Sequence, residues 1–202
     1  ETPGLKDQPD ALLPRIGATI NDYALTLIRQ FELTGLSVVN GFQSILLARN
    51  KFLSLQALAQ NGIPVPNSHY VSNFNNFERV VEKLGGYPVV AKTINSRQGK
   101  GVRLVDSATT GQFIMDNLPD KRQGLLVQEY LPPQGRKDVR AFVLGDKVIG
   151  AMELKPAEGE FRSNINLSAV SRSVTLNPAL KDVAITSAKA LGLEISGADI
   201  IL

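Results

Sequence analysis

The sequence predicts an α/β protein of the α+β kind, in which helices and sheets build more than one unit. Stretches whose apolar residues recur at helical spacing alternate along the chain with short apolar runs of strand length. The middle of the chain, between residues 87 and 153, is rich in strand patterns that pair as hairpins. Residues 1–40 carry a smaller α/β pattern that is typical of the end of a domain.

Residues 1–40 predict one helix between two short strands. Residues 11–17 have the pattern of a short buried strand and turn. Apolar residues then recur at helical spacing from 20 to 31, and Gly35 is placed to end that helix. Residues 36–39 predict the second strand.

Residues 41–130 predict a unit of helices packed on a sheet. Within it, residues 94–101 are expected to form a loop between two hairpin strands. A helical pattern closes at Gly62, and Pro64 and Pro66 lead into the first strand. The expected helices are 41–61, 73–84 and 108–118, and the expected strands are 68–71, 87–93, 102–105 and 125–130.

The last part of the chain predicts a second sheet. A hairpin with strands at 138–144 and 147–153 turns around Gly145-Asp146. Residues 155–170 lack clear periodicity and predict a long loop, and such loops inside a compact domain are usually functional. A helix at about 178–191 and a strand that begins near residue 197 complete the pattern.

Composition excludes several classes of protein. The chain has 202 residues, of which 43% are apolar and 20% charged, and this is ordinary globular composition. Its net charge of +3 comes from basic residues scattered among acidic ones, so charge gives little support to nucleic-acid binding. There is no cysteine, and no apolar run approaches the roughly 20 residues that span a bilayer. We therefore expect a cytoplasmic protein without a membrane partner.

Two lysines and a glycine-containing loop are candidates for binding phosphate groups. Lys92 ends an apolar strand pattern, where burial is costly without an anionic partner, either a triphosphate or a paired carboxylate. In the loop Gln98-Gly99-Lys100-Gly101, glycines would let backbone N–H groups approach phosphate oxygens, and the alternative is a flexible hairpin tip. Lys51 lies near the start of a helical pattern, and its alternative is a solvated lysine.

The segment Gln128-Glu129-Tyr130-Leu131, at the end of a buried strand pattern, is the candidate for binding adenine. Such a strand end offers a backbone N–H and C=O to the polar edge of the base, while apolar neighbours clamp its faces. The alternative is that these residues only mark the point where a strand ends and a loop begins. Asp138 and Arg140 share one face of a strand, so Asp138 is a candidate ribose ligand or the partner of Arg140 in an ion pair.

Arg162, Asn164 and Asp199 are candidates for the reacting end of a nucleotide. A fixed guanidinium suits phosphoryl charge, and the alternative for Arg162 is an exposed loop arginine. Asp199 lies in an apolar strand pattern, so we expect a metal ion or an arginine near it. His69, the one histidine, is expected to be structural.

In this order the fragments resemble the RimK-type branch of the ATP-grasp superfamily, carboxylate–amine ligases that add glutamate to the C-terminus of a small-subunit ribosomal protein. The resemblance extends from Pro14-Arg15-Ile16-Gly17 to Asp199. Its most specific stretches are 51–56 with Gly62-Ile63-Pro64, Gln128-Glu129-Tyr130, Asp138-Val139-Arg140 and 160–164.

The resemblance implies an ATP-grasp fold in which two α+β subdomains clamp ATP. Residues 1–40 would be the remnant of a small pre-ATP-grasp α/β domain. Residues 41–202 would be the ATP-grasp domain, with a lid-like subdomain at about 68–130 and an incomplete C-terminal subdomain.

The resemblance also implies cofactors and site residues. The cofactors are ATP and Mg²⁺, with Mn²⁺ as an alternative ion. Arg162 and Asn164 would be catalytic, and Asp199 would be a metal ligand. The residues implied to bind ATP are Lys51, Lys92, Gln98, Gly99, Gly101, Gln128, Glu129, Tyr130, Leu131, Asp138, Arg162, Ser163 and Asn164.

The chain departs from the family pattern in two loops. Residues 166–169 read Asn-Leu-Ser-Ala where the family carries His-Arg-Gly-Gly, and residues 95–97 read Asn-Ser-Arg where it has Glu-Gly-Thr. The family's further metal ligands, a Glu and an Asn, would lie beyond Asp199. The chain lacks a starting Met and ends in an apolar strand pattern, so we expect it to be part of a longer protein. Alone, it is expected to bind nucleotide weakly and not to turn over.

The sequence therefore predicts an ATP-dependent carboxylate–amine ligase that forms an amide through an acyl phosphate. Its expected partners are ATP, a carboxylate acceptor such as the C-terminus of a ribosomal protein, and an amino acid, with glutamate first. Self-association into a homo-oligomer is also expected. One alternative is a non-catalytic nucleotide-binding regulatory relative, which residues 166–169 favour. A nucleic-acid-binding module is the other alternative, and it rests on net charge alone.

Overall fold

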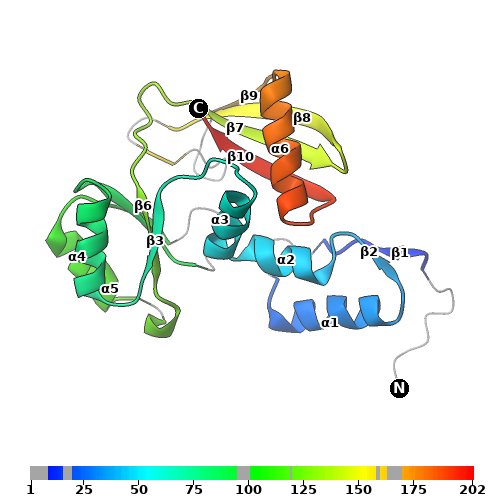
Figure 1. The fold of residues 1–202 in the computed structure, drawn as a ribbon, viewed down its shortest axis with the longest axis horizontal. Helices are drawn as coiled ribbons and strands as arrows, with labels where there is room; N and C mark the ends of the chain where they lie inside the picture. Colours follow the sequence, from blue (N-terminus) through cyan, green and yellow to red (C-terminus); the bar gives the residue numbers. More distant parts are fainter. Residues whose placement is uncertain (1–8, 16–19, 95–100, 119, 158–159, 163–169) are drawn as a thin grey trace.

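A computed structural model describes residues 9–15, 20–94, 101–118, 120–157, 160–162 and 170–202 of the chain (Figure 1). In this part of the chain two four-stranded sheets stand side by side, and a smaller helical unit with a two-stranded sheet lies beside the second one. Within the described residues, no helix is long and apolar enough to cross a membrane.

The small N-terminal unit consists of strands β1 (Ala11–Leu12) and β2 (Ser37–Val38), which pair in parallel, helix α1 (Asp22–Leu33) between them, and the segment from residue 39 through helix α2 (Phe42–Arg49) after them. Gly35 has a φ of +84° after the helix, so its expected role in ending the helix is confirmed. The short strand expected within residues 11–17 is present as β1, but its expected burial is wrong, because Ala11 and the neighbouring Leu13 are exposed, Leu13 to 51%. Residues 16 and 17 of this expectation lie outside the described part of the chain.

Two helices follow where the sequence predicted one over 41–61. Helix α2 (Phe42–Arg49) ends at Asn50, and helix α3 (Lys51–Gln60) begins immediately after it. The Asn50 side chain accepts hydrogen bonds from the backbone N–H groups of Phe52 and Leu53, as an N-cap does. The apolar pattern runs through both helices, so periodicity alone did not reveal the break.

The first four-stranded sheet has the order β3-β6-β4-β5 and is antiparallel throughout. Its strands β3 (Ser68–Val71), β4 (Val89–Lys92), β5 (Val102–Val105) and β6 (Leu125–Glu129) lie where strands were expected. Helices α4 (Phe74–Lys83) and α5 (Ala108–Asp116) cover one face (Figure 1). The core between them consists of Val71, Phe77, Val80, Val81, Val89, Ala91, Val105, Met115, Leu125 and Val127.

The opposite face of this sheet carries polar side chains beside the buried apolar residues Val90 and Leu126. Because side chains alternate along a strand, the core residues Val89 and Ala91 direct Lys92 to the other face. Helix α3 packs on that side, where the ring of Phe52 stacks on Tyr70 with centroids 5.7 Å apart. The face that bears Lys92 is therefore turned away from α4 and α5 and toward α3.

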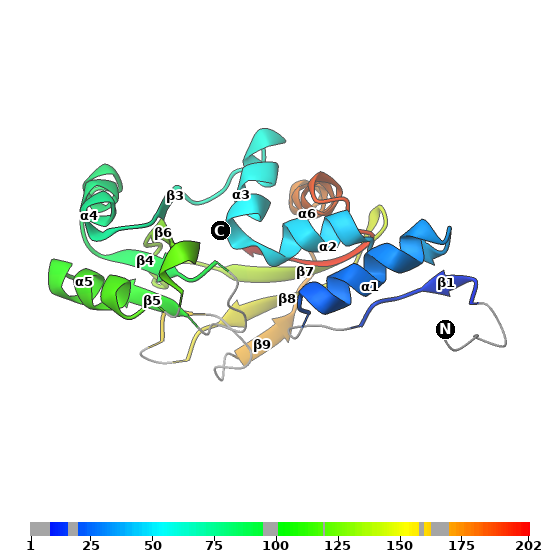
Figure 2. The same ribbon diagram turned by 90° about the horizontal axis from the view of Figure 1, so that it is seen from below.

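The second sheet has the order β10-β7-β8-β9, again with antiparallel neighbours. It contains β7 (Asp138–Leu144), β8 (Lys147–Lys155), β9 (Val170–Ser173) and β10 (Ile195–Ile201), and α6 (Pro178–Ala190) lies across it (Figure 2). Residues packed under α6 are Val139, Ala141, Val143, Leu176, Ala184 and Ala188. By alternation, Asp138 and Arg140 face away from α6.

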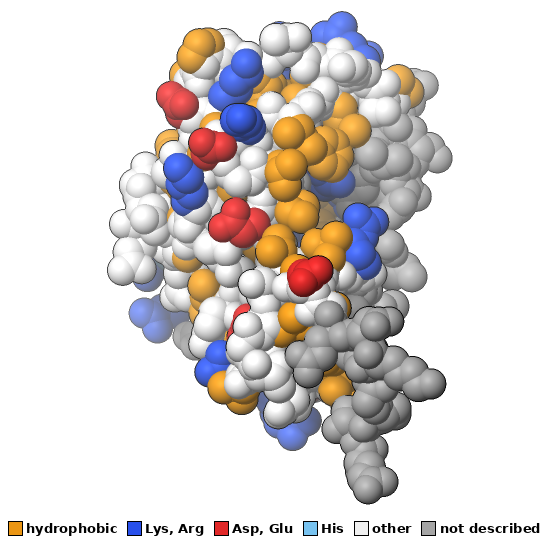
Figure 3. Space-filling model, turned by 90° about the vertical axis from the view of Figure 1, so that its right-hand side faces the viewer, with side chains coloured by type: hydrophobic (Ala, Val, Ile, Leu, Met, Phe, Trp, Pro, Cys, Tyr) orange, Lys and Arg blue, Asp and Glu red, His pale blue; other side chains and the backbone are white. Residues whose placement is uncertain are grey.

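Side chains of the N-terminal unit bind the turn between α6 and β10. Asn40 accepts hydrogen bonds from the backbone N–H groups of Glu194 and Ile195 at 2.8 and 2.9 Å, and it donates to the Ile195 carbonyl at 2.7 Å. Ser44 donates to the Gly192 carbonyl at 2.5 Å. Figure 3 shows the side of the molecule where this unit lies, with described basic, acidic and apolar side chains interspersed.

Candidate functional site

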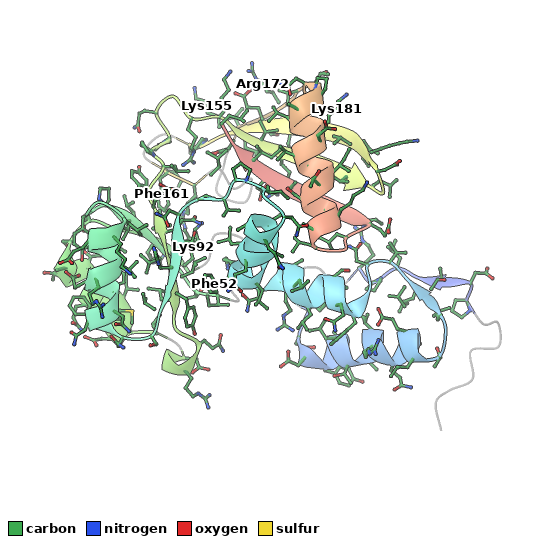
Figure 4. The ribbon with its side chains drawn as sticks, in the orientation of Figure 1. Phe52, Lys92, Lys155, Phe161, Arg172 and Lys181 are labelled. Carbon is green, nitrogen blue, oxygen red and sulfur yellow. The ribbon has the colours of Figure 1, made fainter. Side chains whose placement is uncertain are left out.

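Lys92 lies at the end of β4, in the region where the two sheets meet (Figure 4). Its ammonium group donates to the side-chain carbonyl of Gln128 on the neighbouring strand β6. None of the ion pairs among the described residues includes Lys92. The carboxylate partner that the sequence left open as an alternative is therefore replaced by a neutral amide.

Burial, and after it the nearby positive charge of Arg136, together lower the pKa of Lys92 to about 8. The Arg136 guanidinium is itself almost buried, with 11% of its side chain exposed. Two cationic side chains thus lie close together, and an anion bound between them would relieve the electrostatic cost.

Lys51, the first residue of α3, reaches the end of β4. Its ammonium donates to the backbone carbonyls of Thr93 at 2.9 Å and Ile94 at 3.3 Å. Lys51 is therefore not a solvated lysine, since it joins α3 to the chain entering the glycine-containing loop. Gly101, where the structure resumes after that loop, has a φ of +75° and its carbonyl accepts from the Thr93 N–H at 3.0 Å.

The strand end expected to bind adenine makes hydrogen bonds and a ring contact with neighbouring segments. Glu129 Oε1 accepts from the Asn67 N–H at 2.7 Å, and the Glu129 N–H donates to the Asn67 carbonyl at 3.0 Å. The Leu131 carbonyl accepts from Arg136. The ring of Tyr130 meets Phe161 edge to face, with centroids 6.2 Å apart, so two aromatic rings stand beside the strand end.

Asp138, the candidate ribose ligand, pairs with Arg136 and not with Arg140. The distance from Arg136 Nη2 to Asp138 Oδ2 is 2.8 Å, and the same nitrogen donates to the Phe161 carbonyl at 2.9 Å. Asp138 is 7% exposed. Arg136 therefore connects the strand end at Leu131, the first residue of β7 and the segment that follows β8.

Asp199 on β10 pairs with Arg140 on the adjacent strand β7. The guanidinium binds both carboxylate oxygens, at 2.6 and 2.8 Å, which confirms the expectation of an arginine near Asp199. No group of three or more acidic, histidine or cysteine side chains that could hold a metal ion occurs in the described ranges. These residues alone therefore do not make up a magnesium site, since Mg²⁺ favours several oxygen ligands in octahedral geometry.

Arg162 is bound by Glu160, two residues before it. Its guanidinium donates to both carboxylate oxygens at 2.9 and 2.6 Å, and its side chain is 20% exposed, so it is not the exposed loop arginine of the alternative. Glu160 Oε1 also accepts from the backbone N–H groups of Phe161 and Arg162. These contacts lower the pKa of Glu160 to about 2, mainly through the hydrogen bond from Arg162.

A hollow of about 570 Å³ lies on the α6 side of β10, next to the strand end. Its lining is mostly apolar and comes from α3, residues 63–66, α6 and β10. Glu129, Leu131 and Asp199 contribute to this lining, whereas Lys51 and Lys92 do not. The hollow therefore adjoins the candidate adenine segment but not the candidate phosphate ligands.

Several predicted site residues lie outside the part of the chain that the structure describes. They are Gln98, Gly99, Ser163, Asn164 and residues 166–169. The remaining candidates lie around two residues that the sequence did not single out, Arg136 and Phe161. These candidates are Lys92, Gln128, Asp138, Arg162 and the strand end. The only signal for Arg136 was its position two residues before Asp138, which does not reveal its contacts with Leu131 and Phe161.

Known families match almost the whole chain. The sequence profile described as the RimK-like ATP-grasp domain matches residues 48–202, and that of the RimK PreATP-grasp domain matches residues 4–45. A protein of Marinobacter nauticus named probable alpha-L-glutamate ligase is 38% identical over 192 residues. That alignment covers 95% of this chain and 64% of the relative, so the chain spans less than two thirds of the relative's length.

Solved structures share the fold. A RimK domain ATP-grasp protein of Sphaerobacter thermophilus superposes with a TM-score of 0.74 at 22% identity, over 96% of this chain and 69% of that one. The ATP-grasp ligase PsnB, solved with a minimal precursor, Mg and ADP, superposes with a TM-score of 0.66 at 21% identity, over 89% and 53% of the two chains. The two antiparallel four-stranded sheets described above are therefore arranged as in the ATP-grasp fold.

Proposed function

Because the chain belongs to the RimK-like ATP-grasp family, we propose that it binds ATP and forms part of an ATP-dependent carboxylate–amine ligase. The observation that carries the proposal is the half-buried ammonium of Lys92, which has a neutral hydrogen-bond partner and lies near a second cation, Arg136. A buried charge of this kind is stabilised by an anionic ligand. The triphosphate of ATP is such a ligand.

We assign the remaining parts of ATP to the surrounding groups. The adenine lies against Tyr130 and Phe161, with Gln128, Glu129 and Leu131 along its polar edge, and the ribose lies at Asp138. Lys51 and Lys92 bind phosphates together with the loop that contains Gln98, Gly99 and Gly101. Arg162, Ser163 and Asn164 approach the transferred phosphoryl group. The aromatic pair that stands at the strand end supports this orientation.

The proposed reaction has two steps. A carboxylate oxygen of the acceptor attacks the γ-phosphorus of ATP, the bond to the β,γ-bridging oxygen breaks, and ADP and an acyl phosphate form. An amine nitrogen then attacks the acyl carbon, phosphate leaves, and the nitrogen loses its proton to give an amide. The side chains contribute by positioning the groups and by stabilising charge on the phosphoryl oxygens, for which Lys92 and Arg162 are suited.

Glutamate is the proposed amine and a protein C-terminus the proposed acceptor. The name of the Marinobacter relative supports glutamate, and the precursor bound to PsnB supports a peptide as acceptor. We propose Mg²⁺ as the ion that accompanies ATP, with Asp199 as one ligand after exchange of its ion pair with Arg140. The described residues do not complete this ion's coordination, so no step is assigned to it.

The proposal is tested by ADP release from the native protein with Mg-ATP, screened over pairs of carboxylate and amine substrates. We expect release that requires both substrates, with glutamate as the preferred amine. Lys92→Ala should abolish release, because it removes a cation at the phosphates. Lys83→Ala, at an exposed position of α4, is the matched control and should leave release unchanged.

Other outcomes of the same experiment decide against parts of the proposal. Measurable ATP binding without release for any pair would favour a non-catalytic nucleotide-binding relative, for which the sequence at residues 166–169 is the specific reason. Undiminished release by Lys92→Ala would remove Lys92 from the mechanism.

A further inference from the structure

Three strands of the first sheet bring a row of polar side chains together beside Lys92. Ser68 on β3 lies opposite Gln128 on β6, and Gln128 lies opposite Val90 on β4. Lys92 follows Val90 by two residues, so it shares the same face and reaches Gln128 diagonally. Gln128 is 6% exposed, which makes it one of the two buried polar or charged residues of the described chain.

The direction of the hydrogen bonds in this row follows from its first member. Ser68 donates its one hydroxyl hydrogen to the Pro66 carbonyl at 2.7 Å, so its oxygen can only accept from another group. The group facing it must be the amide nitrogen of Gln128, and the Nε2–Oγ distance is 2.7 Å. Gln128 therefore turns its carbonyl toward Lys92, whose ammonium can only donate.

A neutral acceptor has a different electrostatic effect from a carboxylate at this position. The Gln128 carbonyl directs the ammonium without cancelling its charge, whereas a carboxylate in hydrogen-bond contact would neutralise it. The charged neighbour that lowers the pKa of Lys92 is Arg136, which also carries a positive charge. Asp138 pairs with Arg136 and not with Lys92, so the ammonium of Lys92 keeps an uncancelled charge that an anion can bind.

We infer that Gln128 is a positioning residue, which holds the Lys92 ammonium toward the phosphate groups as a neutral acceptor while Ser68 fixes the direction of its amide. The identity of the anion rests on the proposed function, but the arrangement of the three side chains does not. Sequence reasoning placed Gln128 among the residues that contact ATP. In the structure its side chain contacts Lys92 and Ser68, so the side chain acts on the phosphates through Lys92, while its backbone stays among the groups proposed to border adenine.

Two substitutions of Gln128 distinguish a side chain that positions Lys92 from one that only packs in the sheet. Gln128→Glu keeps the size and the acceptor but adds a charge, and Gln128→Met keeps the length but removes the strong acceptor. The protonation midpoint of Lys92 is read in the native protein without nucleotide, from the pH dependence of its labelling by an amine-reactive reagent, followed by mass spectrometry. Affinity for ATP is measured on the same variants by calorimetry near pH 7.

We expect a midpoint near 8 for the unsubstituted protein, from the burial of Lys92 and its proximity to Arg136. In Gln128→Glu the midpoint of Lys92 should rise by about one pH unit or more, because a carboxylate stabilises the charged ammonium more than an amide does. In Gln128→Met the midpoint should fall, because the ammonium loses its hydrogen-bond acceptor. Both variants should nevertheless bind ATP about tenfold more weakly, corresponding to the loss of one charge-assisted contact. A residue that only fills space would not move the midpoint in opposite directions.

Ser68→Ala tests the fixed amide direction and serves as a second route if a Gln128 variant fails to fold. It leaves Lys92 and Gln128 in place but removes the acceptor of the amide nitrogen, and we expect ATP binding weakened roughly threefold. Gln60→Glu and Ser72→Ala are matched controls at exposed positions and should change neither measurement.

The inference is overturned if Gln128→Glu leaves the Lys92 midpoint and the ATP affinity unchanged, or if the two Gln128 variants shift the midpoint in the same direction. Absence of ATP binding by the unsubstituted protein would count against the proposed function instead. In that case the labelling midpoints, which need no nucleotide, still decide whether Gln128 positions Lys92.

Discussion

The cationic side chains of the candidate site differ in the charge of their partners. Lys92 donates to a neutral amide, whereas Arg136, Arg140 and Arg162 each bind a carboxylate within 2.8 Å. A neutral partner leaves the lysine charge uncancelled, so phosphate binding requires no ion pair to break there. In the proposed ATP complex, Arg162 would have to exchange Glu160 for a phosphoryl group, and this exchange would oppose nucleotide binding.

We therefore expect Glu160→Gln to strengthen ATP binding. The substitution removes one negative charge beside Arg162, and the amide oxygen can still accept from the backbone N–H groups of Phe161 and Arg162. The expected gain is roughly threefold to tenfold, which corresponds to about 0.7–1.4 kcal/mol. Calorimetric titration of the native protein with ATP measures it, and the gain should shrink at high salt.

The control for this prediction is Glu82→Gln, which removes one charge at an exposed position of α4. Weaker ATP binding by Glu160→Gln would contradict the prediction and show that Glu160 aids the site. The pKa of Glu160 is lowered to about 2, so the ion pair contributes stability above the ordinary carboxyl range and loses it only as pH falls toward 2. Glu160 is therefore ionised near pH 7, where the variants are compared.

Strands with one face in a core were predictable from sequence, and elements formed by long-range pairing were not. The strands β3, β5 and β7 lie at their expected positions because apolar residues alternate or cluster within them. Strand β9 was missed, since all four of its residues are exposed and only pairing with β8 makes it a strand. The break between α2 and α3 was missed because the apolar pattern continues across Asn50, the residue whose side chain caps α3.

The packing of α4 against α5 depends on a glycine whose role the sequence did not reveal. A Cβ added at Gly111 would lie 2.5 Å from the ring of Phe77, which is fully buried. Gly111→Ala should therefore destabilise the protein by roughly 1–3 kcal/mol, even though alanine is the better helix former by up to about 1 kcal/mol. Urea unfolding measures the change.

A double-mutant cycle with Phe77→Leu tests the cause of this destabilisation. The smaller side chain leaves room for the added methyl group, so Gly111→Ala should cost less in the Phe77→Leu background. Gly150→Ala is the control, because a Cβ there meets no atom within 4 Å. If Gly111→Ala stabilises the protein, as at an unobstructed helix position, the packing argument is wrong.

The assembly of the candidate site from distant segments was only partly predictable. The order of the fragments identified the strand ends that carry Lys92, Gln128 and Asp138, because local patterns define those ends. Arg136 and Phe161 were not identified, since their roles depend on contacts between the two sheets. Arg136 binds Leu131 beside the first sheet and Asp138 in the second, so one side chain joins the two sheets at the proposed ATP site.

Asn40 joins the N-terminal unit to the second sheet, since its side chain makes three hydrogen bonds to Glu194 and Ile195. In Asn40→Ala these backbone groups would turn to water, at a cost of about 1–3 kcal/mol. The N-terminal unit should then open separately from the rest, so amide hydrogen exchange should accelerate in α1 and α2 while β4 and β6 keep their protection. Asn61→Ala is the matched control, because the Asn61 side chain bonds only to Ala57 of its own helix. Equal acceleration in all elements would mean that Asn40 supports the whole fold and not the attachment of one unit.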